Sequence, residues 1–239
     1  MRKEERGERK EIENQQINKS TNRKSINQQM IKIKDFDQNF KTKLYDGVKK
    51  IEANSQAEAV VMIKHSSGKY FVYSIAAAGI MYVLLMTYFM FSPIEYDPYI
   101  MFGSSIVAAI LVVVAFMVFP GLYRIVIPKK IREKNVEIHA RAIFQKAQMY
   151  KTIESTAFLV YYSLVEKKAV FLADYGITLL MPKEEVDSIN KMFDDALSAP
   201  DPKAAILNGL DKLVPIMAKY LPHRDDDINE LPDDLDIDL

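Results

Sequence analysis

The stretch "TAFLVYYSLVEKKAVFLAD", residues 156–174, decides the fold of the soluble part of this chain. It consists of two nearly continuous apolar runs separated by the charged turn "VEKK", residues 165–168. Runs of this length that are rich in β-branched and aromatic residues are typical of strands buried on both faces. Because so short a turn joins antiparallel neighbours, the stretch predicts a buried β-hairpin whose second strand ends at Asp174.

Further elements are expected on both sides of this β-hairpin. The run "EAVVMIK", residues 58–64, predicts a third buried strand, and an amphipathic helix is expected before it. The apolar stripe of that helix is Phe36, Phe40, Leu44, Val48 and Ile51. A basic helix is expected over about 128–151, and two more helices begin at Pro182 and at Asp201. The inward residues expected for the basic helix are Ile131, Ile138, Ala142, Phe144 and Ala147.

The middle of the chain is apolar enough to cross a bilayer. No Lys, Arg, Asp or Glu occurs between Lys69 and Glu95 or between Asp97 and Arg124. Each run exceeds the roughly 20 residues that a helix needs to span the hydrocarbon core. The link "SPIEYDP" contains two prolines and allows only a tight return, so a transmembrane hairpin is predicted over 70–123. The alternative is a pair of buried core helices, which would need a larger partner domain than this chain supplies.

Charges around the apolar runs predict the orientation of the hairpin. Lys64 and Lys69 precede it and five Lys or Arg residues follow it within 124–134, whereas its tip carries only Glu95 and Asp97. By the positive-inside rule we expect an integral membrane protein with two spans and both termini in the cytoplasm. No ionisable residue lies at mid-membrane depth, which argues against a channel, pump or carrier.

The two soluble segments are expected to fold together. Segment 35–66 offers one helix and one strand, whereas segment 129–222 offers two strands and three helices, so neither completes a core alone. The hairpin returns the chain to the side that it left, and one α/β domain interrupted by a membrane insertion is therefore predicted. Because a helical crossover joins strands 58–64 and 157–164, these should be parallel, and the third strand antiparallel.

The ends of the chain carry opposite charges that cancel to a formal net charge of zero. Segment 1–34 has ten Lys or Arg against five Glu and is expected to be a disordered basic arm, which can bind anionic lipid or simply set orientation. It has no aromatic side chain to stack on bases, so no nucleic-acid partner is expected. Segment 223–239 is an acidic tail. The chain has no cysteine, which excludes disulfides and thiolate chemistry.

Three carboxylates are expected at one edge of the sheet. Parallel pairing places Glu58 and Glu154 at the starts of two strands, and the β-hairpin returns Asp174 to the same end, far from the membrane. Oxygen ligands of this kind suit Ca²⁺ or Mg²⁺. The alternative is that they are solvated strand ends, since no Asp-x-Asp spacing is present. Neither a Gly-rich phosphate loop nor a catalytic His motif is found.

The order of these elements and the residues within them resemble those of the TPM-domain family. The matching stretches are "IEANSQAEAVVMIK" (51–64), "HARAIFQKAQMYKTIESTAFLVYYSLVEKKAVFLADYGI" (139–177), "PKEEVDSINKMF" (182–193) and "KYLPHRDDDINELPDDL" (219–235). The resemblance covers roughly 38–66 and 139–235. It implies an α/β sandwich, with a mixed sheet of three or four strands flanked by helices, tethered to a membrane. In this chain the hairpin lies inside the domain, after the first strand, rather than at one end.

The family also implies two functions. Some of its members are linked to photosystem II repair in thylakoids or to the tuning of a neurotransmitter receptor in nematodes, and acid-phosphatase activity and divalent-metal binding have been attributed to others. We therefore expect a non-catalytic, membrane-anchored accessory or tethering factor, whose partner is another membrane protein or a second copy of the chain. The alternative is a divalent-metal-dependent phosphatase of the same fold, with Glu58, Glu154 and Asp174 as metal ligands.

Overall fold

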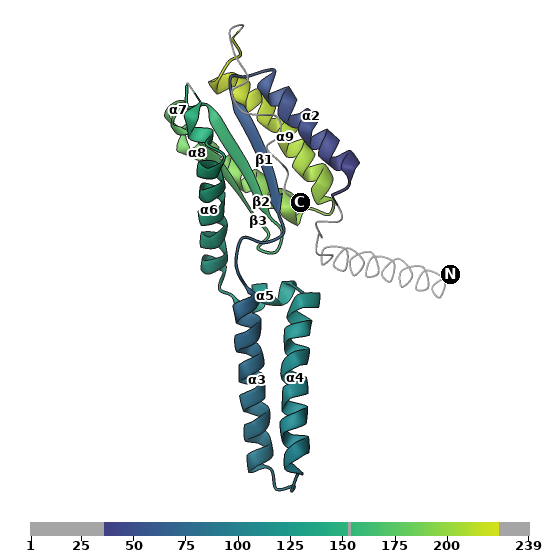
Figure 1. Ribbon diagram of the computed structural model, residues 1–239. Helices are drawn as coiled ribbons and strands as arrows, with labels where there is room; N and C mark the ends of the chain where they lie inside the picture. Colours follow the sequence, from purple (N-terminus) through teal and green to yellow (C-terminus); the bar gives the residue numbers. More distant parts are fainter. Residues whose placement is uncertain (1–35, 153, 225–239) are drawn as a thin grey trace, which may run out of the picture.

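A computed structural model of the chain describes residues 36–152 and 154–224. Within them the chain is mostly helical, with a small sheet and two long apolar helices that extend away from it (Figure 1). In chain order the elements are α2 (Gln38–Glu52), β1 (Glu58–Lys64), α3 (Phe71–Phe91), α4 (Pro98–Val118), α5 (Gly121–Val126), α6 (Lys129–Lys146), the 3-10 helix η2 (Met149–Lys151), β2 (Ala157–Ser163), β3 (Lys168–Ala173), α7 (Tyr175–Leu180), α8 (Lys183–Ser198) and α9 (Pro202–Tyr220). The basic arm 1–34 and the acidic tail from residue 225 lie outside the described residues.

The sheet has the order β1-β2-β3 and is mixed. β1 pairs with β2 in parallel, with Glu58 opposite Ala157 and Lys64 opposite Ser163. β2 pairs with β3 in the antiparallel direction, so that Ser163 also lies opposite Lys168. The three strands and both pairing directions predicted from the sequence are therefore confirmed. We call the end of the sheet where β1 leads into α3 the hairpin-proximal end, and the opposite end the hairpin-distal end.

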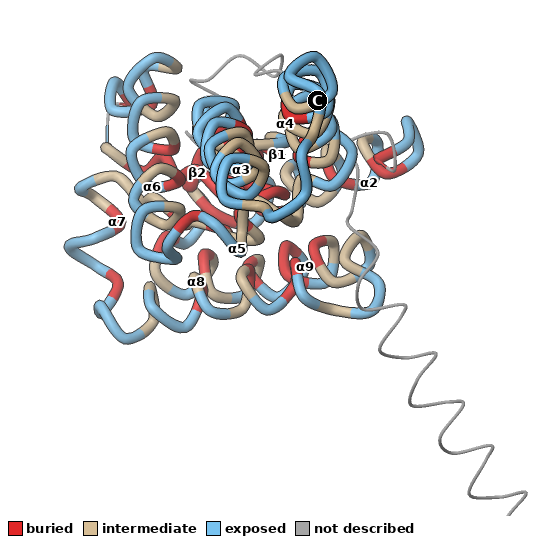
Figure 2. The backbone as a smooth tube through the Cα atoms, turned by 90° about the horizontal axis from the view of Figure 1, so that it is seen from below, coloured by how far each residue is buried: buried red, intermediate tan, exposed pale blue. Residues whose placement is uncertain are grey.

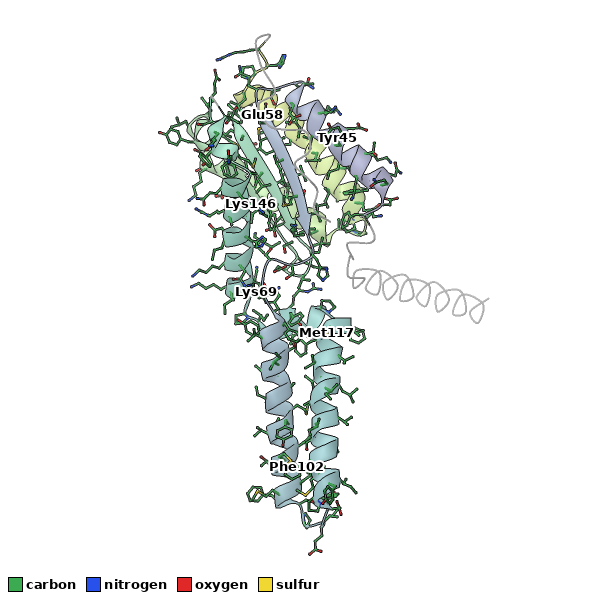
Figure 3. The ribbon with its side chains drawn as sticks, viewed as in Figure 1. Tyr45, Glu58, Lys69, Phe102, Met117 and Lys146 are labelled. Carbon is green, nitrogen blue, oxygen red and sulfur yellow. The ribbon has the colours of Figure 1, made fainter. Side chains whose placement is uncertain are left out.

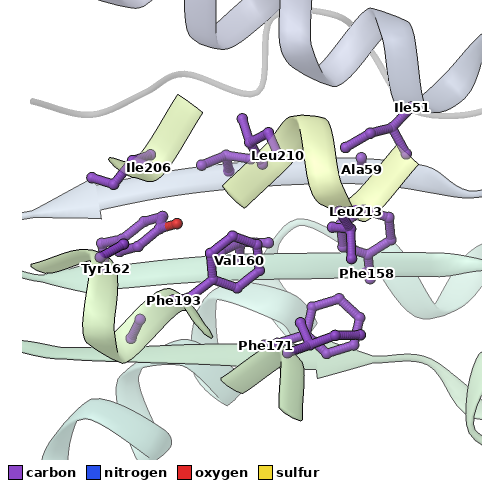
Figure 4. Close-up of a cluster of buried hydrophobic side chains, with 14 of the residues drawn as sticks. Ile51, Ala59, Phe158, Val160, Tyr162, Phe171, Phe193, Ile206, Leu210 and Leu213 are labelled. Atoms are coloured by element: carbon purple, nitrogen blue, oxygen red, sulfur yellow. The ribbon is translucent and has the colours of Figure 1, made fainter. Parts of the chain in front are cut away.

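Alternate residues of the strands fill two separate cores. On one face, Val61, Val160 and Tyr162 pack with apolar residues of α2, α8 and α9 (Figure 4). On the other face, Met62, Leu159 and Tyr161 are joined by buried residues of α6 and by Met149. Because both faces are covered, the strands are apolar throughout rather than alternating, which explains the continuous apolar runs in the sequence.

The segments before and after the apolar helices share the larger core. Phe40 and Leu44 of α2 belong to the same buried cluster as Leu210 and Leu213 of α9. Polar contacts reinforce this packing: Lys50 Nζ lies 2.7 Å from Asp211 Oδ1. The backbone N–H of Gln56 donates to the carbonyl of Leu221 over 3.1 Å. Removing α2 and β1 would therefore uncover one face of the sheet and one side of α9.

Side chains of two helices accept hydrogen bonds from backbone N–H groups at both edges of the sheet. At the β1 edge, the N–H of Ala59 donates to Glu52 Oε1 over 3.2 Å. At the β3 edge, the N–H of Ala169 donates to Asp194 Oδ1 over 2.7 Å. The N–H of Phe171 donates to Asn190 Oδ1 over 2.8 Å.

Helices α3 and α4 form the predicted helical hairpin, and each is long and apolar enough to cross a membrane. Most of their side chains are exposed, as the pale blue helices in Figure 2 show, whereas a core helix of a soluble protein would be largely buried. Ser74 and Ser105 are buried in this hairpin. Gly79 and Gly103 have open space where a Cβ would lie, so the packing of α3 against α4 does not require glycine at either position.

Three local features differ from the sequence prediction. The short helices α5 and α7 were not expected, and the basic helix ends at Lys146 and is followed by η2. The predicted inward stripe of that helix was correct only for Phe144 and Ala147, which are partly buried against the sheet, whereas Ile131, Ile138 and Ala142 are exposed. The residues that α6 buries fully against the sheet are Val136 and Ala140, one turn apart.

Candidate functional site

The carboxylates predicted to bind a metal lie at the hairpin-distal end of the sheet, where Figure 3 labels Glu58. Glu58 is opposite Ala157, and the backbone N–H of Asp174 donates to the carbonyl of Ala157 over 2.9 Å. The two acidic residues therefore flank the same residue of β2 from opposite sides. Two strand spacings separate their backbones, which is roughly 9–10 Å.

The side chains of the other two predicted ligands have different partners. Glu154 forms an ion pair of 2.9 Å with Arg224. Asp174 caps α7, because its Oδ1 accepts a hydrogen bond of 2.8 Å from the N–H of Tyr175, and its buried Oδ2 has no partner among the described residues. No group of three or more His, Asp or Glu residues in the described ranges is arranged to hold a metal ion. Asp174 is therefore a helix cap as well as the end of its strand, and this arrangement gives a metal site no support.

A polar network at the hairpin-proximal end of the sheet was not foreseen from the sequence. Its centre is Glu166, which lies in the turn between β2 and β3 and is only 5% exposed. Glu166 Oε1 accepts hydrogen bonds from the N–H of Ser67 over 2.8 Å and from Ser66 Oγ over 3.3 Å. Its Oε2 accepts a bond of 2.5 Å from Ser163 Oγ. One buried carboxylate thus joins the β-hairpin to the segment that leads from β1 into α3.

The network continues through hydroxyl groups to α6. Ser67 Oγ donates to Ser163 Oγ over 2.8 Å and lies 2.9 Å from the hydroxyl of Tyr161, which is 3.3 Å from His139 Nδ1. Each hydroxyl has one proton, so the bond from Ser163 to the carboxylate fixes the direction of the others. Tyr161 must donate to Ser67, and His139 must carry its proton on Nδ1.

The hydrogen bonds of this network have a structural rather than a catalytic role. Burial raises the pKa of Tyr161 from 10 to about 12, so its hydroxyl stays protonated near neutral pH. Among the described hydrogen bonds, His139 reaches Ser67 only through Tyr161, and both serine protons are directed toward Glu166. Ser163 does have the Glu166 carboxylate as a direct partner, but both residues are buried, so a nucleophile at this position would not be accessible to a substrate. We call this network the clamp, because it holds together the β-hairpin, the segment that follows β1, and α6.

Apolar contacts surround the same junction. Tyr70, Ile127 and Val165 form a small buried cluster that joins the start of α3, the end of α5 and the β-hairpin turn. The ring of Tyr123 lies 5.7 Å from that of Tyr70 and 5.0 Å from that of Phe116. The backbone N–H of Val165 donates to the carbonyl of His65 over 2.9 Å, which extends the pairing of β1 and β2 beyond the strands.

The sequence shows Glu166 only as one residue of the charged turn "VEKK" and gives no direct sign of its burial. The signal that could have found its role was the parallel register of β1 and β2. Parallel pairing brings the carboxyl ends of both strands together, where β1 is followed by the polar residues of "HSSG" (65–68) and β2 ends in Ser163.

One solved structure has a similar fold. The NMR structure of the BA42 protein from the psychrophilic bacterium Bizionia argentinensis aligns with a TM-score of 0.51 and 18% sequence identity, over 84% of this chain and 95% of that chain. At this identity the likeness concerns the fold alone. No protein-family model matches the chain, and none of the curated proteins matches it.

Proposed function

We propose that this chain is a membrane-anchored module of the TPM type that assists or tethers another membrane protein and does not itself catalyse a reaction. In this proposal α3 and α4 cross the bilayer, the α/β domain forms the sandwich of that family, and both termini are cytoplasmic. Support for the orientation comes from Lys64, Lys69 and the basic residues of 124–134, because cytoplasmic flanks are enriched in Lys and Arg.

The observation that carries the proposal is the clamp at Glu166. A flexible linker would let an anchored domain tumble, and a domain that only needs to stay near a membrane requires nothing more. Here a buried carboxylate and an aromatic cluster fasten the domain to the helical hairpin at several points. Such a junction fixes the height and orientation of the domain above the bilayer, which a tethering factor requires.

Two groups of described residues bear on the phosphatase alternative. In the network around Glu166, His139 lies next to Tyr161, and Ser163 donates its proton to the buried carboxylate. The predicted ligands Glu58, Glu154 and Asp174 do not form a metal cluster. The phosphatase alternative therefore enters only as an outcome of the test below.

Photo-cross-linking in native membranes tests the proposal. A photoreactive residue replaces Leu111, which is 61% exposed on α4, or Leu179, which is 66% exposed on α7. A discrete product that contains one other membrane protein, or a second copy of this chain, is expected from at least one position. Lipid adducts alone from position 111, with no protein adduct from position 179, would contradict a tethering role. Hydrolysis of p-nitrophenyl phosphate by the purified full chain that depends on Ca²⁺ or Mg²⁺ would favour the phosphatase.

A further inference from the structure

Three cationic side chains from three different elements meet at the junction. Arg124 lies on α5, Arg132 on α6, and Lys167 in the turn between β2 and β3. Arg132 bridges two of these regions, since its Nε donates to the carbonyl of Ile127 over 3.2 Å and its Nη1 to that of Glu166 over 3.4 Å. We refer to Arg124, Arg132 and Lys167 as the cation cluster.

The members of the cation cluster are close enough to disfavour one another's charges. Burial lowers the pKa of Arg124, and the charge of Arg132 lowers it further. Burial likewise lowers the pKa of Lys167, with a second contribution from Arg124. Arg124 therefore interacts unfavourably with two like charges in partly desolvated surroundings, which destabilises the protein unless an anion compensates it.

No described carboxylate provides that compensation. The carboxylate of Glu166, the acid adjacent in sequence to Lys167, faces the serines, and only its backbone carbonyl faces Arg132. Glu133 on α6 lies 3.6 Å from Lys129 instead. Arg124 Nε is buried and has no hydrogen-bond partner among the described residues. Buried polar groups almost always have partners, so the described chain leaves the charge of Arg124 uncompensated, and only the partly exposed remainder of its guanidinium can meet an external anion.

The position of the cluster indicates which kind of acceptor is nearby. α5 joins α4 to the domain at the level where both long helices end (Figure 1). Tyr123 of α5 packs between Tyr70 and Phe116, and rings of this type favour the headgroup layer of a bilayer. Ile125 is 82% exposed on the same short helix, where it can enter the outer part of the acyl region.

We propose that the cation cluster binds the phosphate of an anionic phospholipid in the cytoplasmic leaflet. The guanidinium of Arg124 donates to the phosphate oxygens, Arg132 presents the edge of its guanidinium that is left free by the two carbonyls, and Lys167 adds a point charge. This inference rests on the proposed function only in requiring that α3 and α4 span the membrane. It adds a specific lipid to the general attraction between basic residues and anionic membranes.

Native mass spectrometry of the full chain, released from nanodiscs of mixed phosphatidylcholine and phosphatidylglycerol, tests this site. We expect the wild type to retain phosphatidylglycerol in preference to phosphatidylcholine. Arg124→Gln and Lys167→Gln should each lower that retention about tenfold or more, because each removes a charge-assisted hydrogen bond to the phosphate. Lys130→Gln removes the same charge from an exposed position on α6 and should leave retention unchanged.

Several results would overturn the site. Equal losses in Lys130→Gln and Arg124→Gln would show surface attraction without a site, and equal retention of both lipids by the wild type would show no selectivity. Stabilisation of the wild type by inorganic phosphate in purely neutral nanodiscs, as large as that by phosphatidylglycerol, would assign the site to free phosphate.

Arg124→Lys, which keeps the charge but loses the planar donor pair, should give intermediate retention even if Arg124→Gln fails to fold. A chain extracted from membranes by alkaline carbonate would refute the proposed anchoring as well, whereas an inserted chain without lipid preference refutes only this site.

Discussion

The backbone N–H of Ser67 donates to the carboxylate of Glu166 over 2.8 Å, although 99 residues and both apolar helices separate them along the chain. This bond closes the loop that the helical hairpin opens. It makes the strand-to-helix segment after β1 part of the folded domain rather than a linker.

Removal of the Glu166 carboxylate should loosen this segment. Glu166→Ala leaves the donors of Ser67 and Ser163 unpaired in a buried site and should cost about 2–3 kcal/mol. Glu166→Gln keeps one acceptor oxygen and should cost less. Guanidinium unfolding of the full chain in nanodiscs measures the stability, and hydrogen exchange at the Ser67 amide reports the local bond. Full protection of that amide in Glu166→Ala would contradict the clamp.

A methyl group at Gly68 should displace Tyr70. A Cβ at position 68 would lie 2.3 Å from atoms of the Tyr70 ring, which is buried against Ile127 and Val165. Gly68→Ala should therefore destabilise the junction by about 1–3 kcal/mol, as overpacking does elsewhere. Gly103→Ala is the matched control, because nothing lies within 4 Å of its Cβ position. Thermal unfolding of both variants in nanodiscs measures the difference, and equal melting temperatures would rule out the predicted clash.

Membrane topology can be measured directly because the chain has no cysteine of its own. Glu95→Cys lies in the link between α3 and α4, and Lys146→Cys lies at the end of α6. A membrane-impermeant maleimide should label position 95 in intact cells and position 146 only after permeabilisation. The reverse pattern would invert the orientation proposed from the basic flanks.

Calcium and magnesium should not stabilise the fold, since the described carboxylates form no cluster. An ion that bound the native state would raise the melting temperature by mass action. We expect no shift for the wild type with either ion. A shift that is lost in Asp174→Asn would restore the predicted metal site.

Apart from any metal, Asp174→Ala should cost about 1 kcal/mol through loss of the α7 cap, and Asp174→Asn less, because Asn also caps helices well.

The two soluble segments should unfold together. Leu44 of the first segment and Leu213 of the second are buried in the same core. Leu44→Ala and Leu213→Ala should each lower the stability of one shared transition by about 2–5 kcal/mol. Two resolved transitions, each moved by only one of the substitutions, would show that the segments fold separately.

The sheet could be predicted from the sequence because its strands are buried on both faces and therefore carry a signal in every residue. The buried stripe of α6 could not, because only Val136 and Ala140 are fully buried while Ile131 and Ile138 are exposed. The pattern of apolar residues alone does not tell which side of such a helix meets the sheet. α5 and α7 have six residues each, too few for a helical period to be read.

The candidate site, too, could be predicted from the sequence only in part. The common edge of Glu58 and Asp174 followed from strand direction, which the sequence predicted correctly. The burial of Glu166 depends on side chains that close over it from a distant segment, and a charged residue in a turn ordinarily faces water. It is the register of β1 and β2 that brings Ser67 within hydrogen-bonding distance of Glu166.

The side chains that occupy the sheet edges restrict how this protein can meet others. Many domains bind a partner by accepting an extra strand, which requires a row of free backbone donors and acceptors at a sheet edge. Glu52 takes the N–H of Ala59 on one edge, and Asp194 and Asn190 take those of Ala169 and Phe171 on the other. Strand exchange between copies and β-augmentation by an extended peptide would first have to break these bonds. Recognition through helix surfaces would leave these bonds intact, and each bond also removes one donor that aggregation through the sheet edges could use.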